Sequence, residues 1–172
     1  SNHSTARVSI LDVDDGISVV VTANRQTAII GCNAYSDYTA YQYLKGHGIH
    51  HIDYLQPLSD ETTEYQNLAK LNEQFQTKNL ILPNGQYFAG DLEKSLEEVE
   101  KISYYEKSAK TILNDDVTIE VYSDAKGSYT VLRVKEIRIL ILSSEYDLTN
   151  INLDLNDIDI LITDNVPQHA EY

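Results

Sequence analysis

The chain has 172 residues, 42% of them hydrophobic, and a formal net charge of −14. A chain of this size can bury one sizeable core, so we expect a single globular domain. No apolar run approaches the roughly 18 residues that a membrane-spanning helix needs. The acidic excess repels a phosphate backbone and leaves little basic surface, which disfavours autonomous nucleic-acid binding.

The first residues are atypical of a native start. Methionine is absent from the chain, and Ser1-Asn2 resembles what remains after a tag is removed. We therefore expect residues 1–5 to be a tag remnant or a disordered N-terminus and residues 6–172 to form the domain. A signal peptide, a lipid anchor or a membrane domain would each fit upstream of it.

The first third of the chain predicts strands followed by a helix. Residues 8–13, 17–22 and 27–31 are short β-branched runs separated by turn signals, which indicates an antiparallel start to a sheet. Residues 35–45 carry apolar and aromatic side chains at helical spacing. A short strand at residues 52–55 follows.

A longer helix is predicted after Pro57. Ser59 or Asp60 can cap its N-terminus, and acidic residues in its first turn would face the helix dipole. Its buried stripe is expected to comprise Leu68, Leu71 and Phe75. Residues 79–83 form the next predicted strand.

The second half predicts one helix and a second group of strands. An acidic amphipathic helix is expected at residues 91–100. A hairpin follows at residues 117–122 and 129–134, then a fully apolar strand at 137–142 and a last strand at 159–163. This order indicates a layered α/β protein in which sheets are sandwiched between helices.

Several segments resemble one family. Leu-Asp-Val-Asp-Asp-Gly-Ile at residues 11–17 and Tyr-Leu-Lys-Gly-His-Gly-Ile-His-His-Ile-Asp-Tyr-Leu at residues 43–55 are the clearest, and the strands at 79–83, 128–134 and 137–142 follow in the same order. Together they resemble the metallo-β-lactamase-like domain of ComEC-type competence proteins across residues 8–166. The resemblance implies a four-layer αββα sandwich, in a membrane-attached protein of DNA uptake. The chain stops soon after residue 166, where the family usually continues, so the closing part is expected to be missing or rebuilt.

The metal-binding motifs of that family are not matched. Its active members carry T-H-x-H-x-D-H after the Ile-Asp strand, because two metal ions need imidazole and carboxylate ligands that converge. Here residues 58–64 read Leu-Ser-Asp-Glu-Thr-Thr-Glu, and the family's later Gly-Asp and His-His-Gly-Ser are also replaced. The resemblance therefore implies a degenerate site without metal, cofactor or catalytic residues. Its former metal positions are Ser59, Glu61, Thr63, Glu64, Ser144 and Asn165.

Other groups of chemically active residues have simpler explanations. His47, His50 and His51 are expected on a solvated turn, and Cys32 is expected to be a buried packing residue. The carboxylates of Asp154, Asp157, Asp159 and Asp164 lack the spacing and the glycine of a calcium loop. The tyrosines of residues 35–43 are expected to pack along a helix. The sequence contains no nucleophile elbow and no phosphate-binding glycine loop.

Three functional hypotheses follow. The first is a non-catalytic interaction or structural module, membrane-associated or extracytoplasmic. Its partner would be a membrane-embedded part of the same gene product or another protein. The second is a divergent metal-dependent phosphodiesterase that uses Asp60, Glu61 and Glu64. The third is an extracytoplasmic ligand-binding module that uses the tyrosine-rich segment.

Overall fold

The computed structural model describes residues 5–13, 16–33, 38–85, 90–143 and 146–163. The expectation for residues 1–4 therefore lies outside the described residues. In the described part of the chain, no helix is both long and apolar enough to span a bilayer.

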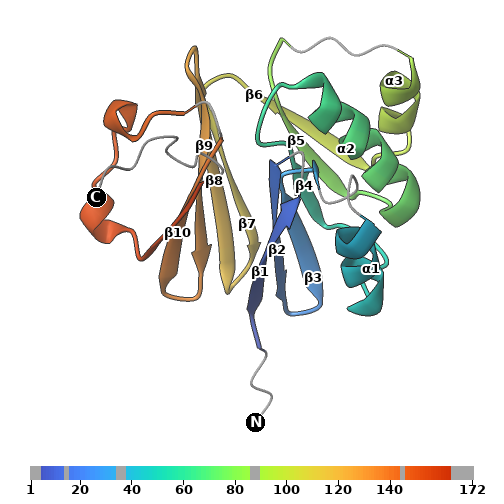
Figure 1. Cartoon of the computed structure of the whole chain (residues 1–172), viewed down its shortest axis with the longest axis horizontal. Helices are drawn as coiled ribbons and strands as arrows, with labels where there is room; N and C mark the ends of the chain where they lie inside the picture. Colours follow the sequence, from blue (N-terminus) through green and yellow to red (C-terminus); the bar gives the residue numbers. More distant parts are fainter. Residues whose placement is uncertain (1–4, 14–15, 34–37, 86–89, 144–145, 164–172) are drawn as a thin grey trace.

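The first sheet holds six strands that neighbour one another in chain order (Figure 1). Its first three strands are antiparallel, as predicted, and the pairs from β3 to β6 are parallel. The change to parallel pairing requires crossover connections, which α1, α2 and α3 supply. The strands are β1 (Arg7–Val13), β2 (Gly16–Ala23), β3 (Gln26–Ile30), β4 (Tyr54–Gln56), β5 (Asn79–Pro83) and β6 (Lys101–Tyr105).

The second sheet holds five strands in the order β11-β10-β9-β8-β7. Strands β7 to β10 form an antiparallel meander, and β11 pairs in parallel with β10. The predicted hairpin and the two following strands are confirmed. The strands are β7 (Ser108–Asn114), β8 (Val117–Asp124), β9 (Gly127–Val134), β10 (Ile137–Leu142) and β11 (Ile160–Thr163).

Helices cover the outer face of the first sheet (Figure 1). They are α1 (Tyr38–Gly46), α2 (Thr62–Phe75) and α3 (Asp91–Leu96). On the second sheet, the described residues in the corresponding layer form two 3-10 turns, η2 (Leu148–Asn150) and η3 (Leu155–Asp157). An apolar cluster that includes Tyr129, Leu140 and Tyr146 packs beneath this segment.

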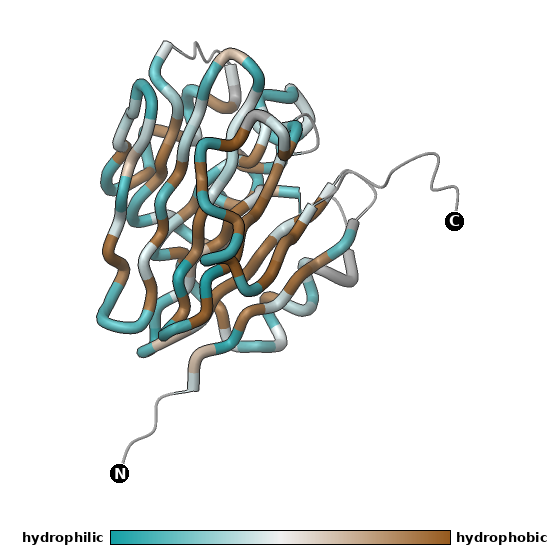
Figure 2. Tube along the Cα trace, turned by 90° about the vertical axis from the view of Figure 1, so that its left-hand side faces the viewer, coloured by the Kyte–Doolittle hydropathy of each residue, from teal (hydrophilic) through white to brown (hydrophobic). Residues whose placement is uncertain are grey.

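The main core lies between the two sheets. Along the strands, hydrophobic residues alternate between two faces because successive side chains of a strand point to opposite sides. Val19, Val21 and Ile30 of the first sheet share one buried cluster with Ile119 and Leu132 of the second. Figure 2 shows the hydrophobic residues concentrated along the strands and hydrophilic residues in the connecting loops.

Several predicted boundaries are corrected by the structure. The helix expected at residues 91–100 ends at Leu96, and β6 and β7 were not predicted. Neither Ser59 nor Asp60 caps α2, because the N-cap residue is Glu61 and its side chain makes no capping hydrogen bond. The predicted stripe of Leu68, Leu71 and Phe75 is buried as expected.

Candidate functional site

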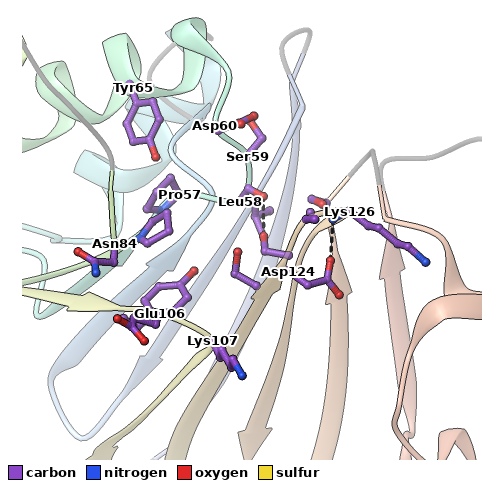
Figure 3. Close-up of a pocket in the computed structure, with 17 residues that line it drawn as sticks. Pro57, Leu58, Ser59, Asp60, Tyr65, Asn84, Glu106, Lys107, Asp124 and Lys126 are labelled. Atoms are coloured by element: carbon purple, nitrogen blue, oxygen red, sulfur yellow. Dashed lines mark hydrogen bonds between the residues drawn. The ribbon is translucent and has the colours of Figure 1, made fainter.

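A cleft of about 610 Å³ opens where loops of both sheets meet (Figure 3). The loop after β4 forms one wall with Pro57, Leu58, Ser59 and Asp60. Since β4 and β5 are parallel neighbours, the segments that follow them emerge at the same edge of the sheet, where ligand sites of such sheets usually lie. The opposite wall is the β8–β9 turn at residues 123–128. We call this space the cleft.

Buried polar side chains join the two sheets below the cleft. Tyr54 Oη donates a hydrogen bond to Gln56 Oε1 at 2.6 Å, and Gln56 Nε2 donates to Thr130 Oγ1 at 2.7 Å. Ser128 Oγ donates to the carbonyl of Leu58 at 3.0 Å. The loop after β4 is therefore tied to strand β9, and its position is fixed by both halves of the sandwich.

Glu64 lies behind the loop after β4, with only 2% of its surface exposed. Its Oε2 accepts hydrogen bonds from the backbone N–H groups of Leu58 and, at 3.4 Å, Cys32. Its Oε1 accepts from Asn33 Nδ2 at 3.4 Å and from Ser59 Oγ at 3.3 Å. This one carboxyl group thus connects α2 to the loops that follow β3 and β4.

Burial raises the pKa of Glu64 to about 7. The cause is desolvation, which penalises the ionised form of a carboxyl group in a low-dielectric interior. Hydrogen bonds from Leu58, Cys32 and Ser59 act in the opposite direction, because they stabilise the carboxylate. Desolvation is the larger effect, so a substantial fraction of Glu64 carries a proton at neutral pH.

The other former metal positions are only partly brought together. Ser59 is half-buried at the cleft, where its Oγ also accepts a hydrogen bond from Glu61 N at 3.3 Å. Glu61 and Thr63 are exposed at the start of α2. Ser144 and Asn165 lie outside the described residues. The structure therefore places Ser59 beside Glu64, and not Glu61 or Thr63.

Solved structures with the same arrangement decide the fold. A metallo-beta-lactamase from Cronobacter sakazakii matches with a TM-score of 0.65 and 9% identity, over 91% of this chain and 76% of that chain. The chain has the metallo-β-lactamase fold. Zn(2+)-bound PqqB from Methylobacterium extorquens matches with a TM-score of 0.59 and 11% identity, over 86% of this chain and 56% of that one. No protein-family model matches the sequence, and no curated protein matches it either.

The residues at the cleft do not fit the dinuclear centre that the metallo-β-lactamase fold can hold. Such a centre needs imidazole nitrogens and carboxylate oxygens that converge on each ion. Of the former metal positions that the structure describes, Ser59 offers a hydroxyl group at the cleft, Thr63 is exposed at the start of α2, and the Glu64 carboxylate is already engaged by backbone donors. Among the described residues, no three His, Cys, Asp or Glu side chains form a group suited to a metal.

The three histidines that the structure describes lie away from the cleft. His47 Nδ1 is 2.9 Å from the carbonyl oxygen of Tyr43, and its ring lies against the Tyr43 ring at a centroid distance of 3.9 Å. His51 Nε2 is 3.5 Å from Asp53 Oδ1, and His50 is exposed. These contacts fit the predicted solvated turn.

The carboxylates of the phosphodiesterase hypothesis do not converge. Asp60 lines the cleft (Figure 3), Glu61 is exposed, and Glu64 points to the backbone of neighbouring loops. The later aspartates also have local partners. Asp154 accepts a hydrogen bond from Asn156 N, Asp159 accepts one from Arg138 N, and Asp164 lies outside the described residues.

Cys32 and the described tyrosines of α1 have packing roles, as predicted. Cys32 is fully buried, and burial raises the pKa of its thiol well above the ordinary value. Little of the thiol is therefore ionised to the thiolate, which is the nucleophilic form. The Tyr41 ring packs edge-on against Phe75 at 5.7 Å, and its Oη donates to Gln74 Oε1 at 3.1 Å. Tyr43 Oη lies 2.5 Å from Ser9 Oγ.

Sequence reasoning missed two features of the site. The first is the inward orientation of Glu64, although its helical phase places it on the same face as Leu68, Leu71 and Phe75. The second is the wall formed by Tyr105, the last residue of β6, and by Glu106 and Lys107, which connect β6 to β7. That wall could not be placed because neither flanking strand was recognised.

Proposed function

We propose that this metallo-β-lactamase-fold domain is non-catalytic and acts as an interaction or structural module of a larger, membrane-attached ComEC-like protein. The observation that carries the proposal is the set of hydrogen bonds at Glu64. A residue at the position of a family metal ligand here holds loops together through its carboxyl group. The module would therefore keep the fold of a metallo-hydrolase, and the hydrogen bonds of a buried side chain, in place of metal ions, would hold the loops in position.

The backbone donors at Glu64 oppose its use as a metal ligand. If its carboxylate turned toward the cleft to bind a cation, the N–H groups of Leu58 and Cys32 would lose their acceptor in a buried environment. Each unsatisfied buried group costs roughly 1–3 kcal/mol. Among the described residues, no group of three His, Cys, Asp or Glu side chains could hold a metal there, and the neighbour of Glu64 is the hydroxyl of Ser59. Both effects oppose a tight metal site.

The DNA-uptake context rests on sequence resemblance. The segment at residues 43–55 is the strongest part of it, and it includes the start of β4 that leads into the cleft. The solved structures support a metallo-hydrolase-like fold and nothing finer. Membrane attachment and the identity of the partner therefore remain part of the proposal.

Metal content tests the proposal directly. The protein is equilibrated with Zn²⁺ or Mn²⁺, dialysed against buffer and analysed for bound metal. We expect no tightly bound ion to remain, because the donor groups at the cleft do not converge. Two ions retained per chain would overturn the non-catalytic assignment.

A nuclease assay separates this proposal from the phosphodiesterase hypothesis. Single-stranded DNA is incubated with the protein and Mg²⁺, Mn²⁺ or Zn²⁺, alongside a Glu61→Ala, Glu64→Ala double variant. We expect no metal-dependent cleavage by either protein. Cleavage by the parent that disappears in the double variant would favour a carboxylate-based hydrolase.

A further inference from the structure

We propose that a second pocket, at the opposite end of the first sheet from the cleft, binds a small phosphate-bearing anion. This pocket has a volume of about 310 Å³. Its polar lining includes Arg7, Ser9, Arg25, Gln26, Tyr43 and His47. We call it the basic pocket. Neither the fold comparison nor the non-catalytic proposal assigns a role to it.

The basic pocket is built by three segments that converge on the helix-covered side of the sheet. Arg7 begins β1 and is paired with Thr22 near the end of β2. Arg25 lies in the two-residue turn between β2 and β3, and His47 follows α1. Figure 1 shows this turn beside α1, at the lower end of the sheet. The cleft is at the other end, where β3 and β4 finish.

The charge of the basic pocket is opposite to that of the whole chain. The chain carries a net charge of −14, yet no Asp or Glu lines this pocket, and two of the four arginines in the sequence do. Within the part of the chain that the structure describes, neither the Arg7 nor the Arg25 guanidinium has an ion-pair or hydrogen-bond partner. Asp53 contacts the backbone of the lining residue Thr27, but its carboxylate also lies near Lys78, at 3.6 Å.

The backbone at Arg25 gives an independent indication of function. Asn24 and Arg25 have φ angles of 52° and 64°, so both residues of the turn are left-handed. Two-residue turns of this kind favour glycine at the second position, because a side chain is strained there. The chain instead places a guanidinium at this position. Strained residues of this kind are concentrated at functional sites, where the surrounding structure holds them in place.

The lining chemistry identifies the ligand class. Guanidinium groups bind phosphate oxygens with pairs of parallel hydrogen bonds, and hydroxyl groups such as that of Ser9 can donate further ones. The rings of Tyr43 and His47, tilted by 31° against each other, provide an aromatic wall that suits a planar group attached to the phosphate. A long polyanion fits less well, because the net negative charge repels it at long range. A small phosphate ester therefore fits best.

The test uses inorganic phosphate, adenosine monophosphate and adenosine, titrated into the protein in a calorimeter. We expect saturable one-site binding of the two phosphate-bearing probes and no binding of adenosine. Arg25→Gly and Arg7→Gln should each weaken binding at least about tenfold, since a charge-assisted hydrogen bond is lost. Arg25→Gly also relieves backbone strain, so the melting temperature of this variant should not fall below that of the parent. Lys101→Gln, which removes an exposed charge on β6, is the matched control and should bind normally.

The possible outcomes are distinct. Binding of adenosine monophosphate at least tenfold tighter than phosphate assigns the site to a phosphate ester, and equal affinities assign it to the free anion. The proposal is overturned if neither probe binds saturably, or if Lys101→Gln weakens binding as much as the arginine variants. It is also overturned if single-stranded DNA binds more tightly than adenosine monophosphate through the same arginines. None of these results depends on whether the cleft is catalytic.

Discussion

Glu64 occupies a position where sequence resemblance points to a metal ligand, and its carboxyl group instead accepts hydrogen bonds from the loops after β3 and β4. Of these two loops, the described residues that line the cleft belong to the loop after β4. A buried carboxyl can replace a metal in holding loops together because it accepts several hydrogen bonds at once. Its weakness is that it must be desolvated, which a metal-bound histidine avoids.

Substitution of Glu64 should separate hydrogen bonding from charge. At pH 5 the buried carboxyl is protonated, and glutamine is its nearest isostere, so Glu64→Gln should change the free energy of unfolding by less than about 1 kcal/mol. Glu64→Ala should lower it by about 3 kcal/mol, because two buried N–H groups lose their acceptor. Urea denaturation followed by circular dichroism measures both. Glu73→Ala, at an exposed position of α2, is the control; equal effects of Glu64→Ala and Glu73→Ala would contradict the role of Glu64.

The raised pKa of Glu64 predicts a specific pH dependence of stability. Its pKa is about 7 in the folded chain, against an ordinary value of 4.5 for the free side chain. Between these values the folded state binds a proton that the unfolded state has released, so stability falls as pH rises through this window. The loss is about 3 kcal/mol, because each pKa unit corresponds to roughly 1.4 kcal/mol.

The measurement compares the parent with Glu64→Gln from pH 4.5 to 7.5. The difference between the two unfolding free energies cancels the effect of the other carboxylates, which both proteins share. We expect the parent to become less stable relative to Glu64→Gln as the pH rises. Parallel profiles for the two proteins would show that Glu64 does not titrate in this range.

The chemistry of the site was only half predictable from sequence. The assignment of Ser59, Glu61 and Glu64 to former metal positions came from the family resemblance and stays a prediction. The burial of Glu64 agrees with its helical phase, since it shares a face with the predicted buried stripe of α2. Its partners could not be predicted, because the loops that donate hydrogen bonds to it are brought there only by the tertiary fold.

At the scale of elements, α3 depends on a buried side chain of α2. Asn72 Nδ2 donates hydrogen bonds to the carbonyl and the Oγ of Ser95, at 2.6 Å and 3.0 Å. Asn72 Oδ1 accepts one from Thr77 N at 3.1 Å, at the entrance to β5. The six residues of α3 are too few to be stable alone, because helix nucleation is unfavourable. Tertiary contacts such as these must hold it.

We therefore expect Asn72→Ala to release α3. The free energy of unfolding should fall by about 2–3 kcal/mol, since Thr77 N loses a buried partner. Hydrogen exchange should accelerate most across α3 and the start of β5. Gln66→Ala, at an exposed position of the same helix, should leave this exchange unchanged. Faster exchange confined to α2 would contradict a role of Asn72 in holding α3.

The two missed strands are among the least buried elements, although the edge strands β1 and β11 were predicted. Strands β2, β3, β5 and β10 are mostly buried and read clearly as apolar runs. Strands β6 and β7 lie at the edges of their sheets, and their residues are mostly exposed or half-buried. With a neighbour on one side only, an edge strand can carry lysine and serine, so its sequence resembles a loop. The end of α3 was missed because residues 97–99 continue as tight turns.

At the scale of the whole molecule, the two sheets are joined by an apolar centre with polar bonds at both ends. Near the cleft, Gln56 bonds to Thr130 across the sandwich. At the far end, Asn114 Nδ2 donates to the carbonyl of Ala23 at 3.1 Å and to Gln26 Oε1 at 2.9 Å. These polar pairs, buried at Gln56 and half-buried at Asn114, favour one alignment of the two sheets, because only that alignment satisfies them all.

The shared core predicts that both sheets unfold together. Leu132 of β9 is fully buried in the cluster that also contains Val19 and Ile30 of the first sheet. Leu132→Ala should lower the free energy of unfolding by about 3 kcal/mol, through lost burial and the cavity that remains. If unfolding is two-state, the slowest-exchanging amides of β2 and β3 should lose as much protection as those of β9, although the substitution lies in the other sheet. Leu155→Ala, at a position with 47% of its surface exposed, should change neither the free energy of unfolding nor the protection of these amides. Protection lost only in β8, β9 and β10 would mean that the two sheets unfold independently and that the interface between them adds little to cooperativity.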